Sequence, residues 1–456
     1  MNPGETSVRP RKKKWARDVL GLVGTKAVLF PLGLVTGILV TRELGPTNRG
    51  VFAFVTLLIG FVGPLLQFGF GNGVRYYVSV GEFCPRDTAF SAFLTRLGLG
   101  VLTSAGLAVL FHFHALGATA DLLTRPQLVP VLVVLPLVGA GTVLRWILVG
   151  DSRFNVVNPI DIAGSLLLVG LLFTTVVVGD MGLNGAIWSL LTAQALGALI
   201  TILAVLLIYK PLLRFDVRSI GMSFSYGIRM WIGSIATRSN DRLDQFVLAV
   251  AASANQLGQY SVAVRVAELP LMLGSVSAPV VFNRVAAAAD SDERVRIIDQ
   301  LHRAHFALVG AVIVVVGLVG YFLIPLVYGE AFEAAALPFL LYLPGVLAYS
   351  SRQVIDKFFS GSGRPFWASI LQIVGLGVGL PLYLYLIPKY GAVGASVASS
   401  LVYSASAFAG LLAYHHFAGP KKANPFAISR QDLKWASQQM KSGLTDWKRG
   451  YRGFWR

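Results

Sequence analysis

Residues 183–208 read LNGAIWSLLTAQALGALITILAVLLI, a stretch without a single charged side chain. A transmembrane helix needs about 20 predominantly apolar residues, so this stretch predicts a helix that crosses a membrane. Similar stretches on both sides of it bring the predicted number of spans to about twelve. They lie near residues 19–41, 51–70, 91–115, 128–149, 160–178, 183–208, 224–250, 258–287, 304–327, 335–357, 365–388 and 392–416. The sequence therefore predicts an all-α, polytopic membrane protein.

The composition supports a membrane protein. Of the 456 residues 55% are hydrophobic and 13% are charged, whereas a soluble domain carries about 25% charged residues. The single cysteine, Cys84, excludes an internal disulfide and a thiolate cluster. The basic start leads into a stretch long enough to span, and no cleavage site follows it, so we expect no cleaved signal peptide.

The net charge of +17 could suggest nucleic acid as a partner. The placement of the charges indicates instead that they set the orientation of the chain in the membrane. With a cytoplasmic amino terminus, about 30 Lys and Arg residues fall on the cytoplasmic side and about four on the other. We therefore expect both termini in the cytoplasm. The predicted organisation is a basic amino terminus (1–18), an N-lobe (19–208), a cytoplasmic linker (209–223), a C-lobe (224–416) and a basic tail (417–456).

The tail after residue 428 has a helical pattern of its own. Ser429 to Asp432 resembles a capping box with an acidic fourth residue, and Leu433, Ala436 and Met440 follow at helical spacing. This pattern predicts an amphipathic helix on the anionic lipids of the inner leaflet. The alternative is a disordered basic tail.

Short motifs recur in the two halves at an offset of about 210 residues. Residues 150–154 (GDSRF) and 182–186 (GLNGA) flank an apolar span, and residues 361–365 (GSGRP) and 391–395 (GAVGA) do the same in the second half. Leu44-Gly45 and Leu257-Gly258 form a fainter pair. Parallel repeats related by an axis along the membrane normal occur in transporters. We therefore expect two six-helix lobes with a site between them.

A charged cluster interrupts the predicted span 224–250. It contains Arg238, Asp241, Arg242 and Asp244. At about 100° per residue these side chains share an arc of roughly 160°. Charges at membrane depth cost several kcal/mol and are functional-site candidates by default. One interpretation is a self-neutralising network that holds the lobes in register. The other is a cavity wall whose guanidiniums bind an anion such as phosphate, while the two carboxylates orient them or carry a coupling ion.

Other charged residues are less specific. Lys26 and Arg265 are further candidates for substrate binding, the former with snorkelling to the inner surface as the alternative. Glu268, three residues after Arg265, is a candidate for charge pairing or coupling. Arg229 is expected to snorkel, and Asp161 to cap the helix predicted at 160–178. Residues expected to mark the cytoplasmic interface are Arg145, Arg352, Asp356 and Lys357.

Several chemistries lack a sequence signal. The histidines show no spacing with acidic residues that demands a metal, and no nucleophile motif, phosphate-binding loop or nucleic-acid module is apparent. We expect no metal and no cofactor. The predicted loops are short, about a dozen residues at most on the outward side. An enzyme such as a polysaccharide polymerase or ligase is therefore disfavoured.

Three motifs together resemble bacterial oligosaccharide flippases of the multidrug/oligosaccharidyl-lipid/polysaccharide exporter superfamily. They are Thr41 to Pro46 (TRELGP), Asp244 followed by Leu257 to Tyr260 (LGQY) with Glu268, and Lys389 to Ala395 (KYGAVGA). The resemblance covers about residues 15–416 and implies two six-helix lobes around a V-shaped cavity. It also implies translocation of a polyprenyl-diphosphate-linked oligosaccharide for surface polysaccharide biosynthesis, with a polymerase and glycosyltransferases as partners. A cation-coupled multidrug or small-molecule antiporter is the alternative within the superfamily; such a transporter favours acidic cavities.

Overall fold

The computed structural model describes residues 12–272, 285, 288 and 290–418. Throughout these residues the elements are helical, and none of them is a β-strand. Eight stretches of the described chain are long and apolar enough to cross a membrane. The predicted all-α, polytopic membrane fold is therefore confirmed. The predicted tail helix and the first eleven residues lie outside the described residues.

Glycine kinks account for much of the difference between eight stretches and the larger number of predicted spans. The stretch Gly24–Leu65 bends at Gly45, whose φ is 66°, and α14 (Pro365–Ala418) bends at Gly391, whose φ is 55°. Glycine adopts this left-handed conformation without a Cβ clash. Each kink falls between two predicted spans, so one continuous stretch contains both.

Helix α9 (Val217–Ala251) covers the predicted span 224–250 but is not among the eight stretches. Its sequence is interrupted by the charges from Arg238 to Asp244. The next predicted span, 258–287, begins within α10 (Ala254–Ala267) and continues beyond the described residues. Helix α9 therefore differs from the apolar spans by its internal charges, which are costly at membrane depth.

The chain forms two compact units, residues 1–235 and 236–456. The first contains α1 (Lys12–Leu57), η1 (Leu58–Val62), α2 (Gly63–Leu65), α3 (Phe70–Ser79), α4 (Pro85–His112), α5 (Ala118–Asp121), α6 (Arg125–Gly150), α7 (Phe154–Leu172), η2 (Phe173–Val178), α8 (Gly182–Tyr209) and the first part of α9. The second contains the rest of α9, α10, α12 (Ser291–Tyr328), η3 (Glu330–Ala335), α13 (Ala336–Gly361) and α14.

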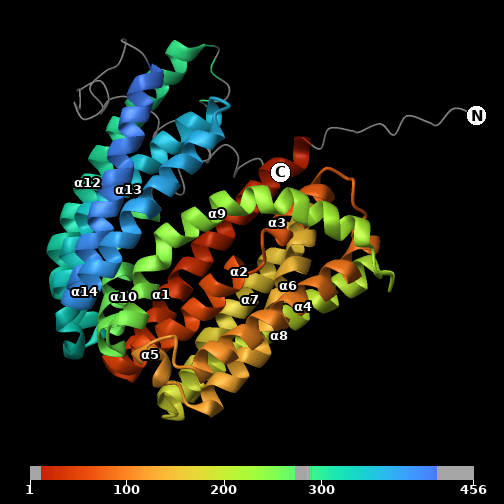
Figure 1. The fold of residues 1–456 in the computed structure, drawn as a ribbon, viewed down its shortest axis with the longest axis horizontal. Coiled ribbons are helices and arrows are strands. Elements are labelled where there is room, and N and C mark those ends of the chain that lie inside the picture. The colour runs from red at the N-terminus through yellow and green to blue at the C-terminus, as the bar shows by residue number, and fades with distance from the viewer. Residues whose placement is uncertain (1–11, 273–284, 286–287, 289, 419–456) are drawn as a thin grey trace, which may run out of the picture. The chain divides into compact units, whose positions relative to one another are not determined.

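Within the first unit, α6 packs against α3, α4 and α8, and α7 packs against α1 and α8 (Figure 1). Ile147 and Leu148 of α6 and Phe70 of α3 are fully buried in one hydrophobic cluster. Helix α6 starts with a capping box, in which the Thr124 amide donates to Oε1 of Gln127 at 3.0 Å. Such a box satisfies amide groups that a helix start otherwise leaves without partners. The buried α6 thus forms the centre of this unit.

Within the second unit, α13 packs against α10, α12 and α14. Ile298 of α12, Phe359 of α13 and Tyr414 of α14 meet in a second hydrophobic cluster. Asp290 caps α12 by accepting a hydrogen bond from the Glu293 amide at 2.7 Å. Helix α13 therefore forms the centre of this unit.

The first half of α9 is held against α3 by contact between small residues. A Cβ on Gly69 would collide with the carbonyl oxygen of Gly227, and a Cβ on Gly73 with that of Ser223. Trp231 adds a hydrogen bond from Nε1 to the Leu65 carbonyl at 2.8 Å. Small residues allow such backbone approach between membrane helices. The boundary between the units therefore falls inside α9, directly before the charged cluster.

The recurring motifs adopt the same local geometry in each unit. In the α6–α7 turn, Ser152 has φ 58° and the Arg153 amide donates to the Leu148 carbonyl at 2.8 Å. In the α13–α14 turn, Gly363 has φ 74° and the Arg364 amide donates to the Phe359 carbonyl at 2.8 Å. Gly182 and Gly391, which open the second pair of motifs, have φ values of 52° and 55°. The sequence repeat therefore corresponds to a repeated helical hairpin.

Candidate functional site

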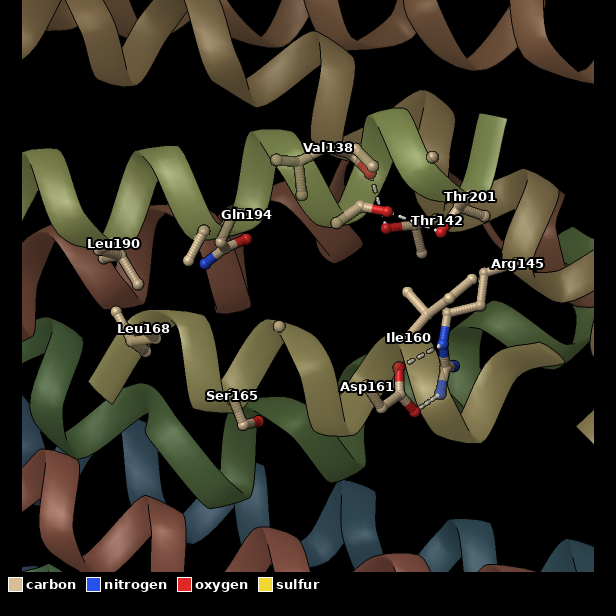
Figure 2. A pocket seen from close by; sticks show the side chains of 15 residues that line it. Val138, Thr142, Arg145, Ile160, Asp161, Ser165, Leu168, Leu190, Gln194 and Thr201 are labelled. Atoms are coloured by element: carbon tan, nitrogen blue, oxygen red, sulfur yellow. Dashed lines mark hydrogen bonds and ion pairs between the residues drawn. The ribbon is translucent and has the colours of Figure 1, made fainter. Parts of the chain in front are cut away.

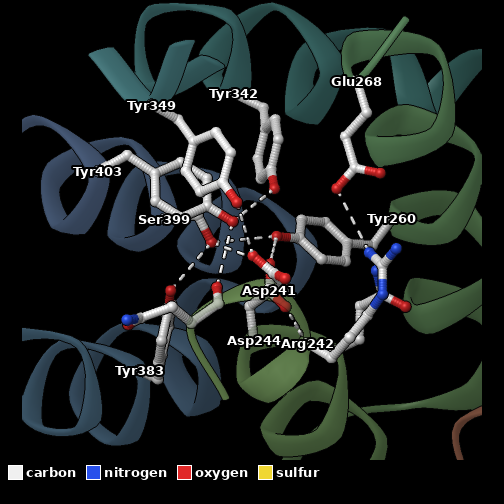
Figure 3. A network of polar contacts seen from close by, with 12 residues as sticks. Asp241, Arg242, Asp244, Tyr260, Glu268, Tyr342, Tyr349, Tyr383, Ser399 and Tyr403 are labelled. Atoms are coloured by element: carbon white, nitrogen blue, oxygen red, sulfur yellow. Dashed lines mark hydrogen bonds and ion pairs between the residues drawn. The ribbon is translucent and has the colours of Figure 1, made fainter. Parts of the chain in front are cut away.

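The charged cluster of α9 lies in a polar network built from four helices of the second unit (Figure 3). Helix α9 supplies two aspartates and an arginine, and α10 supplies a glutamate and a tyrosine. Helices α13 and α14 supply four tyrosines and a serine. The labelled residues are Asp241, Arg242, Asp244, Tyr260, Glu268, Tyr342, Tyr349, Tyr383, Ser399 and Tyr403.

Asp244 is the most enclosed charged residue of the network, with 0% of its surface exposed. Its Oδ2 accepts hydrogen bonds from the Tyr260 hydroxyl at 2.5 Å and from the Ser399 hydroxyl at 3.0 Å. The Tyr383 hydroxyl lies 3.3 Å from the same serine oxygen. A buried carboxylate is tolerated when hydrogen bonds replace its hydration. The hydroxyls of α10 and α14 supply these bonds.

Asp241 is bound by a different helix. Its Oδ1 accepts a hydrogen bond from the Tyr349 hydroxyl of α13 at 3.0 Å. The ring of Tyr349 also stacks beneath the guanidinium of Arg352, whose Cζ lies 4.9 Å from the ring centroid. Such cation–π contacts are favourable when they are shielded from water. Asp241 is thus held on the α13 side of α9.

Arg242 pairs with Glu268 at the end of α10, with Nη1 and Oε1 3.3 Å apart. The two side chains are 41% and 29% exposed. Arg238, one turn earlier, is exposed and makes no hydrogen bond or ion pair with a described residue. Arg238 is therefore the most exposed charge of the cluster, Asp241 and Arg242 are half-buried, and both aspartates bond to hydroxyl groups of other helices.

This arrangement differs from a self-neutralising network along one helix. The expected pairs Arg238–Asp241 and Asp241–Asp244 satisfy the helical spacing, but the partners of both aspartates are tyrosines on other helices. Arg242 likewise reaches Glu268 rather than a neighbour on α9. The reason is that packed helices offer hydroxyl groups close to each carboxylate, and an exposed ion pair on one helix contributes only about 0.3–0.5 kcal/mol.

The other residues predicted to bind substrate do not belong to this polar network. Lys26 is exposed on α1, in the first unit. Arg265 is exposed in the last turn of α10, and Glu268, predicted beside it, contacts Arg242. Arg229 is exposed on α9 and its Nε donates to the Ser225 carbonyl at 3.2 Å. Of the seven predicted side chains, the network in Figure 3 includes Asp241, Arg242, Asp244 and Glu268.

Two residues expected at the interface form a buried pair instead. Arg352 and Asp356, which are 3% and 15% exposed, join at 3.0 Å on α13. Their i,i+4 spacing was the signal for this pair. Helix α14 and the Tyr349 ring cover Arg352, and its expected place at the membrane interface stays a prediction.

The five tyrosines and Ser399 of the network were missed by sequence reasoning. Tyr260, Tyr342 and Tyr403 have almost no exposed surface. The hydroxyls of Tyr342 and Tyr403 lie 3.1 Å apart, and Tyr403 donates to the Asn240 carbonyl at 3.2 Å. A buried tyrosine usually needs a hydrogen-bond partner. The available signal was the position of these tyrosines within predicted apolar spans, where a hydroxyl group needs a partner.

The first unit contains a cavity of about 320 Å³ between α6, α7 and α8, lined by apolar residues and several polar ones (Figure 2). In it Arg145 binds Asp161 with two hydrogen bonds, Nε to Oδ1 at 3.1 Å and Nη2 to Oδ2 at 2.5 Å. The predicted helix cap is wrong, because Asp161 lies inside α7, which begins at Phe154. Arg145 turns toward that carboxylate and lines the cavity, and its expected place at the membrane interface stays a prediction.

Arg96 of α4 is a second arginine that the sequence interpretation passed over. It is buried, and its Nη2 donates to the Gly63 carbonyl at 3.2 Å. Its guanidinium lies against Gly139 of α6, where any side chain would collide with it. Gly139 therefore makes room for this charge inside the bundle.

Metal-binding groups are absent from the part of the chain that the structure describes: no three His, Cys, Asp or Glu side chains there form a group that could hold a metal ion. His114 and Asp121 form an exposed pair at 2.7 Å between α4 and the following loop helix. Two ligands on a surface do not make a structural metal site, which usually has four. The site chemistry within the described residues is therefore that of hydrogen bonds and ion pairs.

Comparisons with known proteins agree with this geometry. A sequence model described as "Polysaccharide biosynthesis protein" matches residues 39–337. Curated protein sequences give no match. Among solved structures, lipid II flippase MurJ in an inward closed conformation is similar with 15% identity and a TM-score of 0.71, covering 87% of each chain. An inward-facing multidrug resistance transporter of the MATE family has 16% identity and a TM-score of 0.67, covering 84% of this chain and 92% of that chain.

A third similar structure is a MOP superfamily transporter from Pyrococcus furiosus, described by a binding pocket of reverse polarity that suggests a different function. It has 17% identity and a TM-score of 0.57, covering 90% of this chain and 96% of that chain. At these identities the likeness concerns the fold. The match over residues 39–337 covers more than half of the 456 residues. The chain therefore belongs to the polysaccharide biosynthesis protein family, and it has the fold of transporters of the MOP superfamily.

Proposed function

We propose that this protein flips a polyprenyl-diphosphate-linked oligosaccharide across the bacterial cytoplasmic membrane by alternating access, as a step in surface polysaccharide biosynthesis. It is a transporter rather than an enzyme in this proposal, with both termini in the cytoplasm. The membership of the polysaccharide biosynthesis family supports the glycan part of the substrate. The charged cluster of α9 supports the diphosphate part.

The observation that carries the proposal is the unequal exposure of positive and negative charge on α9. Arg238 is exposed and the Arg242 side chain is 41% exposed, whereas Asp244 is fully buried and the half-buried Asp241 is bonded to the Tyr349 hydroxyl. A ligand that reaches this part of α9 therefore meets guanidiniums first. Arginine binds phosphate groups through two parallel hydrogen bonds. A diphosphate carries enough negative charge to compete with the single long bond between Arg242 and Glu268.

The buried carboxylates have a different role in this proposal. Asp244 is surrounded by hydroxyls from α10 and α14, so the binding or loss of a proton or Na⁺ there changes the hydrogen bonds between these helices. Asp241 makes the corresponding contact with α13. Intramembrane carboxylates of this kind commonly form proton relays in transporters. We assign coupling to Asp244 and Asp241, and we assign to Glu268 the neutralisation of Arg242 when substrate is absent.

A cation-coupled antiporter for drugs or other small molecules is the second candidate. The observation that favours it is the same buried Asp244, together with the likeness to a multidrug transporter. A cationic substrate, however, needs an accessible carboxylate. The aspartates of α9 are occupied by tyrosine hydroxyls, and the exposed charges beside them are positive.

Several partners follow from the proposal. The flippase receives its substrate from glycosyltransferases on the cytoplasmic side and delivers it to a polysaccharide polymerase on the outer side. Its basic cytoplasmic segments meet anionic lipid of the inner leaflet. Nucleic acid has no role.

The proposal is tested by surface polysaccharide in cells that depend on this protein. We expect Arg238→Ala and Arg242→Ala to reduce surface polymer at least about tenfold, since each loses a charge-assisted hydrogen bond to phosphate. Arg229→Ala is the matched control, because Arg229 is an exposed arginine of the same helix and, among the described residues, its side chain hydrogen-bonds to Ser225 alone. Membrane protein levels are measured by immunoblot. Normal polymer in both cluster variants contradicts the proposed anion site.

A further inference from the structure

The cavity between α6, α7 and α8 has a lining unlike that of an ordinary membrane bundle. Its volume is about 320 Å³, near the lower end of the range of small-molecule sites, about 300–1,000 Å³. All three helices belong to the apolar stretches long enough to span a membrane. An ion pair and an amide inside such a cavity need a reason, because unsatisfied polar groups at membrane depth are costly.

The charged pair in this cavity is balanced and still has bonding capacity. Arg145 uses Nε and Nη2 for Asp161, which leaves Nη1 without a partner among the described residues. The side chains are 36% and 27% exposed. Their formal charges cancel, so the pair offers hydrogen-bond donors and acceptors without a net positive charge that would attract an anion. A diphosphate is therefore a poor match, whereas a neutral hydroxyl-rich group is a good one.

Two further polar side chains of the cavity have no protein partner. Gln194 of α8 and Ser165 of α7 make no hydrogen bond with a described residue, and both line the cavity. Figure 2 shows them along the same space as the Arg145–Asp161 pair. An amide provides two donors and one acceptor oxygen, and a hydroxyl provides both functions. This mixture of donors and acceptors matches the hydroxyl groups of a sugar.

Glycines keep the cavity open. A Cβ on Gly164 or on Gly197 would meet no atom within 4 Å, although both residues line the cavity. A larger side chain at either position therefore has room to extend into the cavity. The apolar end, formed by Val138, Leu168 and Leu190, offers a surface for the less polar face of a sugar ring.

We propose that this cavity is a saccharide subsite that binds a neutral sugar unit of the transported glycan through Arg145, Asp161, Gln194 and Ser165. The inference rests on the proposed function, since it assigns the glycan and the diphosphate of one substrate to different groups. The small volume accommodates a short part of an oligosaccharide. Recognition at this place distinguishes a glycosylated carrier lipid from the bare lipid.

The experiment measures binding of two probes to the full-length protein in nanodiscs. One probe is undecaprenyl diphosphate, and the other is the undecaprenyl-diphosphate oligosaccharide extracted from the cells that produce the polysaccharide. We expect the wild type to bind both, the glycosylated lipid at least tenfold more tightly. Gly164→Leu and Gly197→Leu fill the cavity without touching a polar group. Each is expected to abolish this tenfold preference, equivalent to about 1.4 kcal/mol, while binding of undecaprenyl diphosphate stays unchanged.

The matched control is Gly170→Leu, because Gly170 lies on α7, has the same open space around its Cβ and does not line the cavity. It is expected to keep the wild-type preference. Gln194→Ala and the neutral double variant Arg145→Gln/Asp161→Asn test the polar contacts independently if a leucine variant does not fold. Each is expected to lower only the affinity for the glycosylated lipid.

The outcomes separate the two proposals. If the wild type binds both lipids and the folded cavity variants retain the preference for the glycosylated one, the saccharide subsite is wrong and the proposed flippase stands. If the wild type binds neither lipid, the proposed function is wrong and the subsite is wrong with it. Equal loss of both lipids in the cavity variants also overturns the subsite, because it shows a general disturbance of binding.

Discussion

The hydroxyl of Tyr260 donates a 2.5 Å hydrogen bond to the carboxylate of Asp244, and neither residue has exposed surface. The bond joins α10 to α9 at the centre of the polar network. It explains how a carboxylate persists in a segment expected at membrane depth. It also makes the carboxylate dependent on a neutral hydroxyl group rather than on an ion pair.

Replacing Tyr260 by phenylalanine leaves this carboxylate with one fewer donor. We expect Tyr260→Phe to lower the free energy of unfolding by about 1–3 kcal/mol, the usual cost of an unsatisfied buried group. Thermal unfolding of the protein in detergent measures the effect. Tyr383→Phe is the control, since Tyr383 reaches Ser399 rather than the carboxylate itself. Equal stability of the Tyr260→Phe variant and the wild type contradicts the structural role of the bond.

The assignment of coupling to Asp244 predicts a change in energy dependence. Asp244→Asn keeps the size of the side chain and can still bond to Tyr260 and Ser399, but it cannot release or take up a proton or hold Na⁺ by charge. We expect export in this variant to become insensitive to ionophores that dissipate the proton or sodium gradient. The measurement compares surface polymer with and without ionophore. Loss of export on ionophore treatment in the variant, as in the wild type, excludes coupling through Asp244.

The pair of Arg242 and Glu268 predicts opposite effects of its two neutral variants. Glu268→Gln removes the competing carboxylate and is expected to retain or strengthen binding of undecaprenyl diphosphate. Arg242→Gln is expected to weaken it at least about tenfold, because a charge-assisted bond is lost. Binding to protein in nanodiscs distinguishes them. If both variants lose binding equally, the pair acts as a structural unit and Arg242 is not an anion ligand.

For the buried Arg352–Asp356 pair on α13, we expect removing one charge to destabilise the protein more than removing both. Asp356→Ala leaves the Arg352 guanidinium without its carboxylate, and we expect a loss of about 3–5 kcal/mol. The double variant Arg352→Met/Asp356→Leu removes both charges and is expected to be near neutral. Arg153→Ala is the surface comparison, since its pair with Asp151 is exposed and contributes about 0–1 kcal/mol. Similar stability of the single and double variants on α13 disproves this account of the pair.

The glycine contacts of α3 and α9 predict a folding defect. Gly73→Ala places a methyl group against the Ser223 carbonyl, so the two backbones must separate. We expect little folded protein after detergent extraction, judged by size-exclusion chromatography. Gly98→Ala serves as the comparison, because a Cβ there meets open space. A well-folded Gly73→Ala variant contradicts the close packing of these helices.

Much of the fold was predictable because membrane spans follow from long apolar stretches. The stretch 183–208 became α8, and the recurring motifs at 150–154 and 361–365 became turns with the same backbone hydrogen bond. The joining of spans at Gly45 and Gly391 was not predictable, since a glycine permits either a turn or a kink. The division inside α9 depends on the contact between Gly73 and Ser223, which are far apart in the sequence.

The site was predictable only as a set of charges. The sequence indicated Arg242, Asp241 and Asp244 because charged residues are rare in an apolar segment that could span a membrane. Their partners were not, since Tyr260 and Ser399 come from helices whose rotation the sequence does not specify. Arg145 and Asp161 were each interpreted alone, and only the packing of α6 against α7 brings them together.

The central claim is that the arginines of α9 carry a lipid diphosphate across the membrane, and transbilayer movement in proteoliposomes tests it most directly. The measurement follows the undecaprenyl-diphosphate oligosaccharide from one leaflet to the other by its accessibility to an added glycan-cleaving enzyme. We expect the lipid to move across the bilayer with the wild type and with Arg229→Ala. With Arg238→Ala and Arg242→Ala we expect the rate of this movement to fall at least about tenfold. Wild-type rates in both cluster variants, or no movement with the wild type, contradict it.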